Sequence, residues 1–318
     1  MMEVLVLGAG VSGLTVAWRL LERGHRVRLW ARESPLETTS AVAAALWYPF
    51  EAQPADRVAD WAIRSLEGFR ELAQNPETGV RFHPCLDLAD ELREPPTWAA
   101  RLPGFERTVE ETLLAGYRDG WRIELPVIET PIYLPWLVEQ IRSLGGEVEQ
   151  REVHSLDETR AFPVVVLCTG LGSRELANDD QVFPIRGQIE RVEQTDIDRS
   201  SIFMRTDGSF GYIVPRSADV ILGGTAKRDE WSLASSEEAT RRIRDGCTRI
   251  EPSLADASPL GTIVGLRPGR TEVRLEAEPL PDGRTVVHNY GHGGCGVTLS
   301  LACAEDVVAL VEKHGRAS

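Results

Sequence analysis

The hydrophobic positions of the first thirty residues follow a strand pattern, then a helix pattern, then a strand pattern again. Residues 4–7 are a short apolar run bounded by glycine, which is typical of a buried parallel strand. Apolar side chains then recur at helical spacing over residues 12–22, and Gly24 occupies the position that often follows a helix. A second apolar run covers residues 27–30. We therefore predict a strand–helix–strand unit at the N-terminus.

The same alternation continues along the rest of the chain. It predicts helices over residues 60–72, 133–144, 235–250 and 299–313, with Pro135 in the first turn of the second of these. It predicts strands at residues 163–168, 185–192, 210–215 and 220–222, and another strand that begins at Val148. Residues 73–130 predict short strands and loops. We therefore expect an α/β fold whose middle stretch forms a mostly antiparallel sheet with one face over a pocket.

Three glycines between the first strand and the first helix have the spacing G-x-G-x-x-G. Gly8 permits a tight turn, Gly10 lets the backbone approach a pyrophosphate, and Gly13 lets the helix pack closely on the strand. The helix N-terminus, at Val11 and Ser12, supplies free N–H groups for a phosphate. This context predicts a dinucleotide site, but the loop alone does not separate NAD from FAD.

Two further segments predict contacts with such a ligand. Glu33 follows Gly13 by 20 residues and either accepts from a ribose hydroxyl or is simply solvated. Residues 34–50 are rich in small and hydroxyl side chains, which suits close approach to a flat ligand. An alanine-rich helix capped by Thr39 or Ser40 fits the same pattern equally well. The strand at residues 163–168 runs into Thr169 and Gly170, at the end of a strand where ligands gather in α/β sheets.

Composition narrows the classes of partner and compartment. The chain has 318 residues, enough for two structural domains, and 35 basic against 49 acidic residues give a net charge of −14. An acidic surface argues against a nucleic-acid partner. The five cysteines form no CxxC pair, so we expect no disulfide framework. No signal peptide, no run of 18 apolar residues and no peroxisomal C-terminal tripeptide is recognised, so we expect a cytoplasmic protein that does not enter a membrane.

Seven stretches carry a resemblance to a known family. They are residues 6–14 (VLGAGVSGL), 43–49 (AAALWYP), 186–188 (RGQ), 211–215 (GYIVP), 222–225 (LGGT), 266–268 (LRP) and 288–298 (HNYGHGGCGVT), of which the last is the most specific. Over essentially its full length, the chain resembles D-amino-acid oxidase and its relative D-aspartate oxidase. The resemblance implies a Rossmann-like FAD-binding domain built from residues 1–50, 131–185 and 261–318. Residues 51–130 and 186–260 would form the substrate-binding domain.

The resemblance also implies which residues bind FAD, without a covalent bond. They are Gly8, Gly10, Val11, Ser12, Gly13, Arg32, Glu33, Thr39, Ser40, Ala45, Leu46, Gly170, Gly293, Gly294, Gly296, Val297 and Thr298. Those in the glycine-rich loop at 293–298 would lie at the oxygen-bearing edge of the flavin, where N–H groups stabilise negative charge on the reduced ring.

For the substrate, Arg267 matches the arginine that pairs with the α-carboxylate, and Tyr212 matches a tyrosine that donates to the same group. The carbonyl of Gly294 matches the acceptor for the amine. Arg205 has the spacing at which D-aspartate oxidases carry an arginine for the side-chain carboxylate, although we expect neutral side chains. Gly208 stands where a lid tyrosine is common, and Phe210 is a candidate substitute.

The implied activity is the oxidation of D-amino acids by hydride transfer to flavin N5. Dioxygen would be the second substrate, and the products would be a 2-oxo acid, ammonia and hydrogen peroxide. No side-chain acid or base and no metal is expected, and a homo-oligomer is compatible with the pattern. Three alternatives stay open: a D-aspartate oxidase, a glycine or sarcosine oxidase, and a non-enzymatic dinucleotide-binding module.

Overall fold

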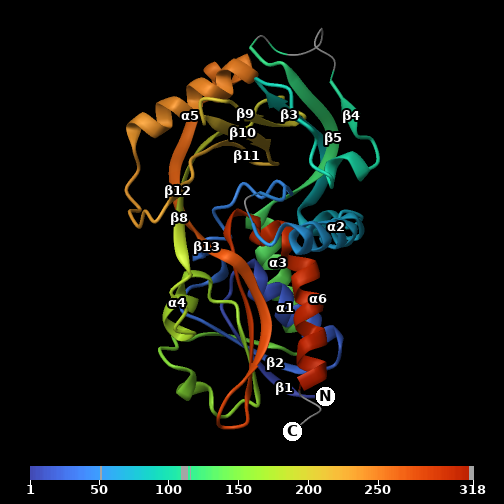
Figure 1. Cartoon of the computed structure of the whole chain (residues 1–318), viewed down its shortest axis with the longest axis vertical. Helices are drawn as coiled ribbons and strands as arrows, with labels where there is room; N and C mark the ends of the chain where they lie inside the picture. Colours follow the sequence, from blue (N-terminus) through green and yellow to red (C-terminus); the bar gives the residue numbers. More distant parts are fainter. Residues whose placement is uncertain (51, 109–113, 115, 315–318) are drawn as a thin grey trace.

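The computed structural model describes residues 1–50, 52–108, 114 and 116–314. Its strands form one continuous mixed sheet in the order β4-β5-β3-β9-β10-β11-β8-β13-β14-β7-β1-β2-β6, and β12 (Lys227–Arg228) pairs with β8 off this path. Figure 1 shows two halves, one holding β1, β2 and most helices, the other holding β3, β5 and β9–β11. The predicted α/β fold is confirmed.

The first half is built on five parallel strands. Its strands are β1 (Glu3–Leu7), β2 (Arg26–Ala31), β6 (Glu147–Gln150), β7 (Val164–Leu167) and β14 (Thr285–His292), all joined in parallel pairs. The helix α1 (Val11–Glu22) connects β1 to β2, as the hydrophobic spacing predicts. Gly24 has φ +78°, the left-handed conformation expected just beyond a helix. Because the five strands are parallel, all their carboxyl ends point to one edge of the sheet.

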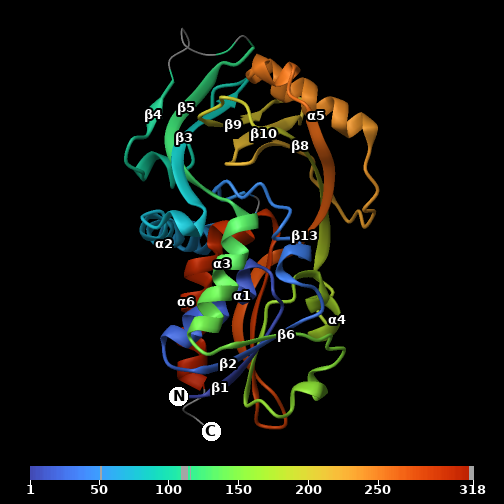
Figure 2. The same ribbon diagram turned by 180° about the vertical axis from the view of Figure 1, so that it is seen from behind.

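Helices cover this half because each one buries an apolar stripe. Besides α1 they are α2 (Ala55–Leu72), α3 (Thr130–Ser143) and α6 (Gly296–His314), with the short α4 (Ser173–Leu176) after β7. Figure 2 shows α1, α3 and α6 side by side on one face. Indole Nε1 of Trp61 donates to Asp306 at 2.7 Å and so joins α2 to α6. Pro131, not Pro135, occupies the first turn of α3, and Pro135 lies inside the helix, so that prediction is wrong.

The second half is mostly antiparallel, as predicted. Its strands are β3 (Val80–Ala89), β4 (Glu106–Arg107), β5 (Asp119–Ile128), β9 (Ser200–Met204), β10 (Phe210–Pro215) and β11 (Asp219–Gly223). The helix α5 (Glu237–Ile250), capped by the Ser236 side chain, packs on its outer face. β3 and β5 have ten residues each, longer than the short strands we predicted over residues 73–130.

Two long strands connect the halves. β8 (Phe183–Glu193) and β13 (Pro259–Pro279) pair with each other in antiparallel register and extend from one half into the other (Figure 1). Side chains near the middle of this pair therefore reach both the parallel strands and the antiparallel sheet.

One helix of the described chain, over Gly293–His314, is long and apolar enough to cross a membrane. However, 67% of its apolar window is buried inside the protein, where α6 packs against α1 and α2. This burial is that of a core helix.

Candidate functional site

A cavity of about 790 Å³ lies at the carboxyl edge of the parallel strands and continues between the two halves. That volume is in the range of small-molecule and cofactor sites. The residues that follow β1, β2, β6, β7 and β14 all contribute to its wall, as expected for ligand sites in open α/β sheets. Other walls come from β8 and β13 and from one face of β9 and β10.

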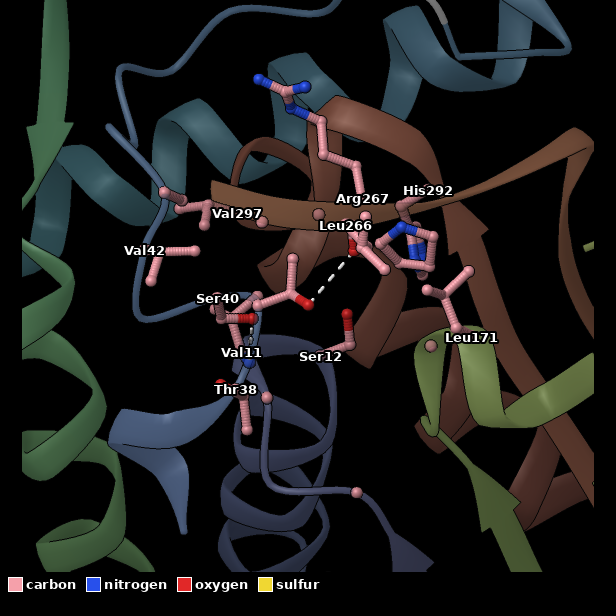
Figure 3. Close-up of a pocket in the computed structure, with 18 of the residues that line it drawn as sticks. Val11, Ser12, Thr38, Ser40, Val42, Leu171, Leu266, Arg267, His292 and Val297 are labelled. Carbon is pink, nitrogen blue, oxygen red and sulfur yellow. Dashed lines mark hydrogen bonds between the residues drawn. The ribbon is translucent and has the colours of Figure 1, made fainter. Parts of the chain in front are cut away.

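The glycine loop after β1 is shaped to admit a ligand. Gly8 has φ +107°, and a Cβ there would overlap the carbonyl of Cys168. Gly10 is the N-cap of α1 and has no side chain to cap the helix, so the N-terminal N–H groups stay available. One of them, on Val11, donates to Ser40 Oγ at 3.0 Å (Figure 3). Since the first turn of α1 contains no acidic residue, an anion is favoured here.

Gly13 has a different place from the other two glycines. It does not line the cavity, and a Cβ there would overlap the carbonyl of Gly8. Gly13 therefore brings α1 close to the first strand, which is the packing role that the motif assigns to its third glycine.

The segment over residues 34–50 forms no alanine-rich helix, so that alternative is wrong. Only Pro35–Glu37 makes a short helical turn, and the chain beyond it runs along the cavity with Thr39, Ser40, Ala45 and Leu46 in its wall. The backbone hydrogen bonds that a helix needs are made elsewhere, because Ile128 N–H donates to the Ala45 carbonyl at 2.9 Å. The hydroxyl of Thr39 donates to the Leu266 carbonyl at 3.2 Å, which ties this segment to β13.

The end of the cavity next to β2 carries paired charges. Arg32 and Glu33 both line it, with Arg32 Nη2 2.8 Å from Glu33 Oε1, and the Arg32 guanidinium also lies 3.7 Å from Glu152. Hydrogen bonding to the Glu33 carboxylate raises the pKa of Arg32. Residues 151–154 line the same end, and sequence reasoning missed them. A signal existed, because they directly follow the strand predicted to begin at Val148.

A second helix N-terminus faces the cavity at the start of α6. Gly293 and Gly294 belong to a tight helical turn, Gly293–Cys295, and α6 begins at once with Gly296. Val297 and Thr298, in the first turn of α6, also line the cavity, and that turn contains no acidic residue. Negative charge is therefore favoured at this wall as well. Gly170, after β7, lines the cavity opposite Pro268.

Two buried polar side-chain atoms in the wall lack a hydrogen-bond partner within the described part of the chain. His292 is 4% exposed, and its Nε2 makes no hydrogen bond with the described residues. Asn289 is also buried, and its Oδ1 accepts no hydrogen bond from them. Burial lowers the pKa of His292 to about 4, so the ring is neutral at pH 7. Buried polar atoms are usually satisfied, so these two atoms fit a site completed by a bound polar molecule. Our sequence analysis assigned neither residue to the site.

Arg267 and Tyr212, far apart in the sequence, meet where the two halves join. Arg267 lies on β13 and Tyr212 on β10, and both line the cavity. The Arg267 guanidinium donates from Nη1 to the Thr225 carbonyl at 3.0 Å, and across the described ranges no carboxylate forms an ion pair with it. Burial raises the pKa of Tyr212, an effect that the neighbouring Arg267 charge opposes. The phenol is therefore a hydrogen-bond donor at neutral pH.

Beside this pair the cavity wall is apolar. Tyr212 pairs with Ile202 and Phe210 pairs with Met204 across β10 and β9, so these four side chains share one face of the sheet. All four line the cavity. Phe50 completes the wall from the opposite side, with its ring centroid 5.8 Å from that of Phe210.

Arg205 lies outside this arrangement. It is not among the residues that line the cavity, and its guanidinium is 3.7 Å from both Asp90 and Asp207. Gly208, at the position of a lid tyrosine in the family, also lies away from the cavity. Phe210 is in the cavity wall, as the sequence suggested for a substitute.

Comparison with known proteins places these features in context. The family described as FAD dependent oxidoreductase matches residues 3–310. A D-amino-acid oxidase from Rubrobacter xylanophilus is 48% identical over 97% of this chain and 95% of that protein. One from Streptomyces coelicolor is 46% identical over 97% of this chain and 96% of that protein. The human D-aspartate oxidase is 34% identical over 98% of this chain and 95% of that protein.

Solved structures share the fold at much lower identity. Glycine oxidase from Bacillus cereus superimposes with a TM-score of 0.78 at 19% identity, covering 98% of this chain and 95% of that one. An L-alpha-glycerophosphate oxidase from Mycoplasma pneumoniae, solved with FAD bound, gives a TM-score of 0.76 at 15% identity over 98% and 94% of the two chains. At these identities the likeness concerns the fold alone.

Proposed function

This chain belongs to the FAD-dependent oxidoreductase family that includes the D-amino-acid oxidases, and from that premise we propose that it oxidises D-amino acids with neutral side chains. The overall reaction converts the amino acid, dioxygen and water into a 2-oxo acid, ammonia and hydrogen peroxide. The observation that carries the proposal is the Arg267 guanidinium, which lies in the cavity beside Tyr212 with no described carboxylate as its ion-pair partner.

The cavity fits FAD on the evidence of its own residues. Gly8 and Gly10 line the cavity where the chain turns into α1, and the N–H group of Ser12 would bind a pyrophosphate there, while the Val11 N–H donates to Ser40. Arg32 and Glu33 would hold the adenosine end, and the segment with Thr39, Ser40, Ala45 and Leu46 would lie along the cofactor. When bound, FAD supplies the redox chemistry by accepting a hydride at N5 and passing two electrons to dioxygen.

The protein's own contribution to catalysis is to position the substrate. Arg267 presents a planar fork of N–H donors to the α-carboxylate, and the neutral Tyr212 hydroxyl donates to the same group. The Gly294 carbonyl would accept from the amine. With the carboxylate and the amine both held, the α-carbon has one orientation, and orientation of this kind lowers the barrier without a side-chain base. We propose that the half with the parallel strands binds FAD and that the antiparallel half binds the substrate.

The apolar wall argues for neutral side chains. Ile202, Met204 and Phe210 lie on the same sheet face as Tyr212, and a side chain directed toward them would meet no positive charge. A second carboxylate there would lose its hydration without gaining a partner. Arg205, the candidate partner for a D-aspartate side chain, is held outside the cavity by Asp90 and Asp207. It therefore gives no support to the D-aspartate alternative.

Anaerobic mixing of the FAD-containing protein with single amino acids tests the proposal. We expect D-alanine to bleach the flavin absorbance and L-alanine to leave it unchanged, with colour and hydrogen peroxide appearing when air is admitted. D-aspartate, glycine and sarcosine should reduce the flavin far more slowly than D-alanine. Faster reduction by glycine or sarcosine would contradict the proposal, and no reduction by any amine would favour a binding module. A cytoplasmic location and homo-oligomerisation also stay predictions.

A further inference from the structure

The guanidinium of Arg267 lies flat over a glycine on the neighbouring strand. A Cβ added to Gly187 would be 2.5 Å from Cζ of Arg267 and equally close to its Nη2, a separation at which the side chain has to move. The atoms in the way form the far end of a flexible side chain rather than backbone. A methyl group at position 187 would therefore displace the guanidinium rather than disrupt the sheet.

Strand register explains why this glycine meets that arginine. Arg267 on β13 pairs with Ile185 on β8, and Gly187 is the next residue of β8 on the same face. Diagonal neighbours of this kind lie within reach of a long side chain. Gly187 itself pairs with Gly265, so two glycines opposite each other hollow out the sheet. Arg267 lies over Gly187 in this hollow, and Val42 lies over Gly265, 2.9 Å from where a Gly265 Cβ would be.

A second contact fixes the guanidinium from the other direction. Arg267 Nη1 donates to the carbonyl of Thr225 at 3.0 Å. The hydroxyl oxygen of the same threonine accepts from the backbone N–H of Gln188 at 2.9 Å. Thr225 thus links the arginine to the strand that carries Gly187, and the position of the guanidinium is set on two sides.

We propose that Gly187 and Thr225 are positioning residues that set the depth and orientation of Arg267 and thereby determine how tightly a substrate carboxylate is bound. This inference rests on the proposed function of Arg267. Neither residue needs to touch the substrate, because each acts through the guanidinium. Gly187 provides the space into which the fork settles, and Thr225 orients the fork within that space.

Equilibrium binding of benzoate to the FAD-containing protein provides the test. Benzoate is a rigid carboxylate with no amine and no α-hydrogen, so it can occupy the site without reacting, and the flavin absorbance reports its binding. Displacing the fork removes one charge-assisted hydrogen bond, so Gly187→Ala should weaken benzoate binding by about 10- to 100-fold. Thr225→Val should weaken it as well, and Thr225→Ser, which keeps the hydroxyl, should restore binding close to that of the unmodified protein.

A double-mutant cycle distinguishes positioning of Arg267 from a general disturbance of the sheet. The unfolding midpoint in urea is measured for Gly187→Ala with Arg267 present and with Arg267→Ala. We expect the penalty to disappear in the second background, since no guanidinium remains to be displaced. Gly265→Ala is the matched control: it occupies the paired position but contacts Val42, so its effect should be the same in both backgrounds.

The outcomes separate this inference from the proposed function. Weakened benzoate binding together with a penalty that depends on Arg267 supports the inference. If the unmodified protein is reduced by D-alanine but Gly187→Ala binds benzoate normally, or its unfolding penalty is independent of Arg267, the inference is wrong and the proposed function stands. If the unmodified protein neither binds benzoate nor is reduced by D-alanine, both are overturned.

Discussion

Replacing Arg267 with methionine tests the central step of the proposed reaction. The substitution removes the planar donors and the charge but keeps an unbranched stem of similar length. Arg267 is half-buried, and one of its five N–H groups is already given to the Thr225 carbonyl, which leaves the others for a carboxylate. The variant should therefore lose substrate binding while retaining the cavity around it.

The expected loss can be estimated from the bonds involved. A fork that binds a carboxylate bidentately makes two charge-assisted hydrogen bonds, each worth about 1.5–3 kcal/mol. Their combined loss of about 3–6 kcal/mol corresponds to a fall in kcat/KM for D-alanine of about two to four powers of ten. The protein itself loses the bond to Thr225, about 1 kcal/mol of folding free energy, and the contact of the guanidinium with Tyr212.

Steady-state peroxide production with D-alanine measures this effect, and flavin content and the unfolding midpoint serve as checks of integrity. Arg205→Met is the matched control, because that arginine lies outside the cavity, and its kcat/KM should change by less than about threefold. A fall of less than about tenfold in Arg267→Met, with flavin content intact, would refute the assignment of Arg267 to the carboxylate.

Three further substitutions test two residues of the cavity wall and one buried ion pair of the antiparallel half. Phe210→Ala removes the ring beside Phe50 and should lower kcat/KM for D-phenylalanine relative to D-alanine by about tenfold or more; equal losses for the two substrates would contradict an apolar side-chain wall. His292 is held neutral by burial, with a pKa near 4 against the usual 6.5, so the unfolded chain takes up a proton first as pH falls. Folding free energy of about 3 kcal/mol that depends on the neutral ring is therefore fully present above pH 6.5 and lost by about pH 4. In urea unfolding, the free energy of His292→Asn should fall less between pH 6.5 and pH 4 than that of the unmodified protein. Asp87→Asn should destabilise the protein by about 3–5 kcal/mol, because this buried carboxylate accepts from Arg93, and an unchanged urea midpoint would argue that the ion pair contributes nothing.

Local patterns predicted much of the fold because strands and helices have different periods. The unit from β1 to β2 was predicted within one or two residues, since its apolar spacing changes from one period to the other at the glycine loop. The position of Pro135 was wrong, because the helix begins earlier, with Pro131 in its first turn. The prediction started this helix at Tyr133 and did not consider Pro131, which suits a first turn equally well.

The site was only partly accessible to the same reasoning. For residues 34–50 the small side chains fitted a helix and a ligand wall equally well, and pairing with the β5 edge decided the outcome. No local pattern in the sequence marks His292 as a site residue, because the missing hydrogen-bond partner of its Nε2 depends on what the fold places around it. Arg205 and Arg267 are both arginines in or beside strands, yet only Arg267 lines the cavity.

The sequence by itself determined the strand–helix–strand unit, the glycine loop and the family resemblance, because these depend on short-range spacing and residue type. Only the tertiary structure decided that Gly187 lies beneath the guanidinium of Arg267 and that Arg205 stays outside the cavity. The physical reason is register. A shift of one residue between β8 and β13 would turn Arg267 to the opposite face of the sheet, and that alignment is set by the packing of both halves.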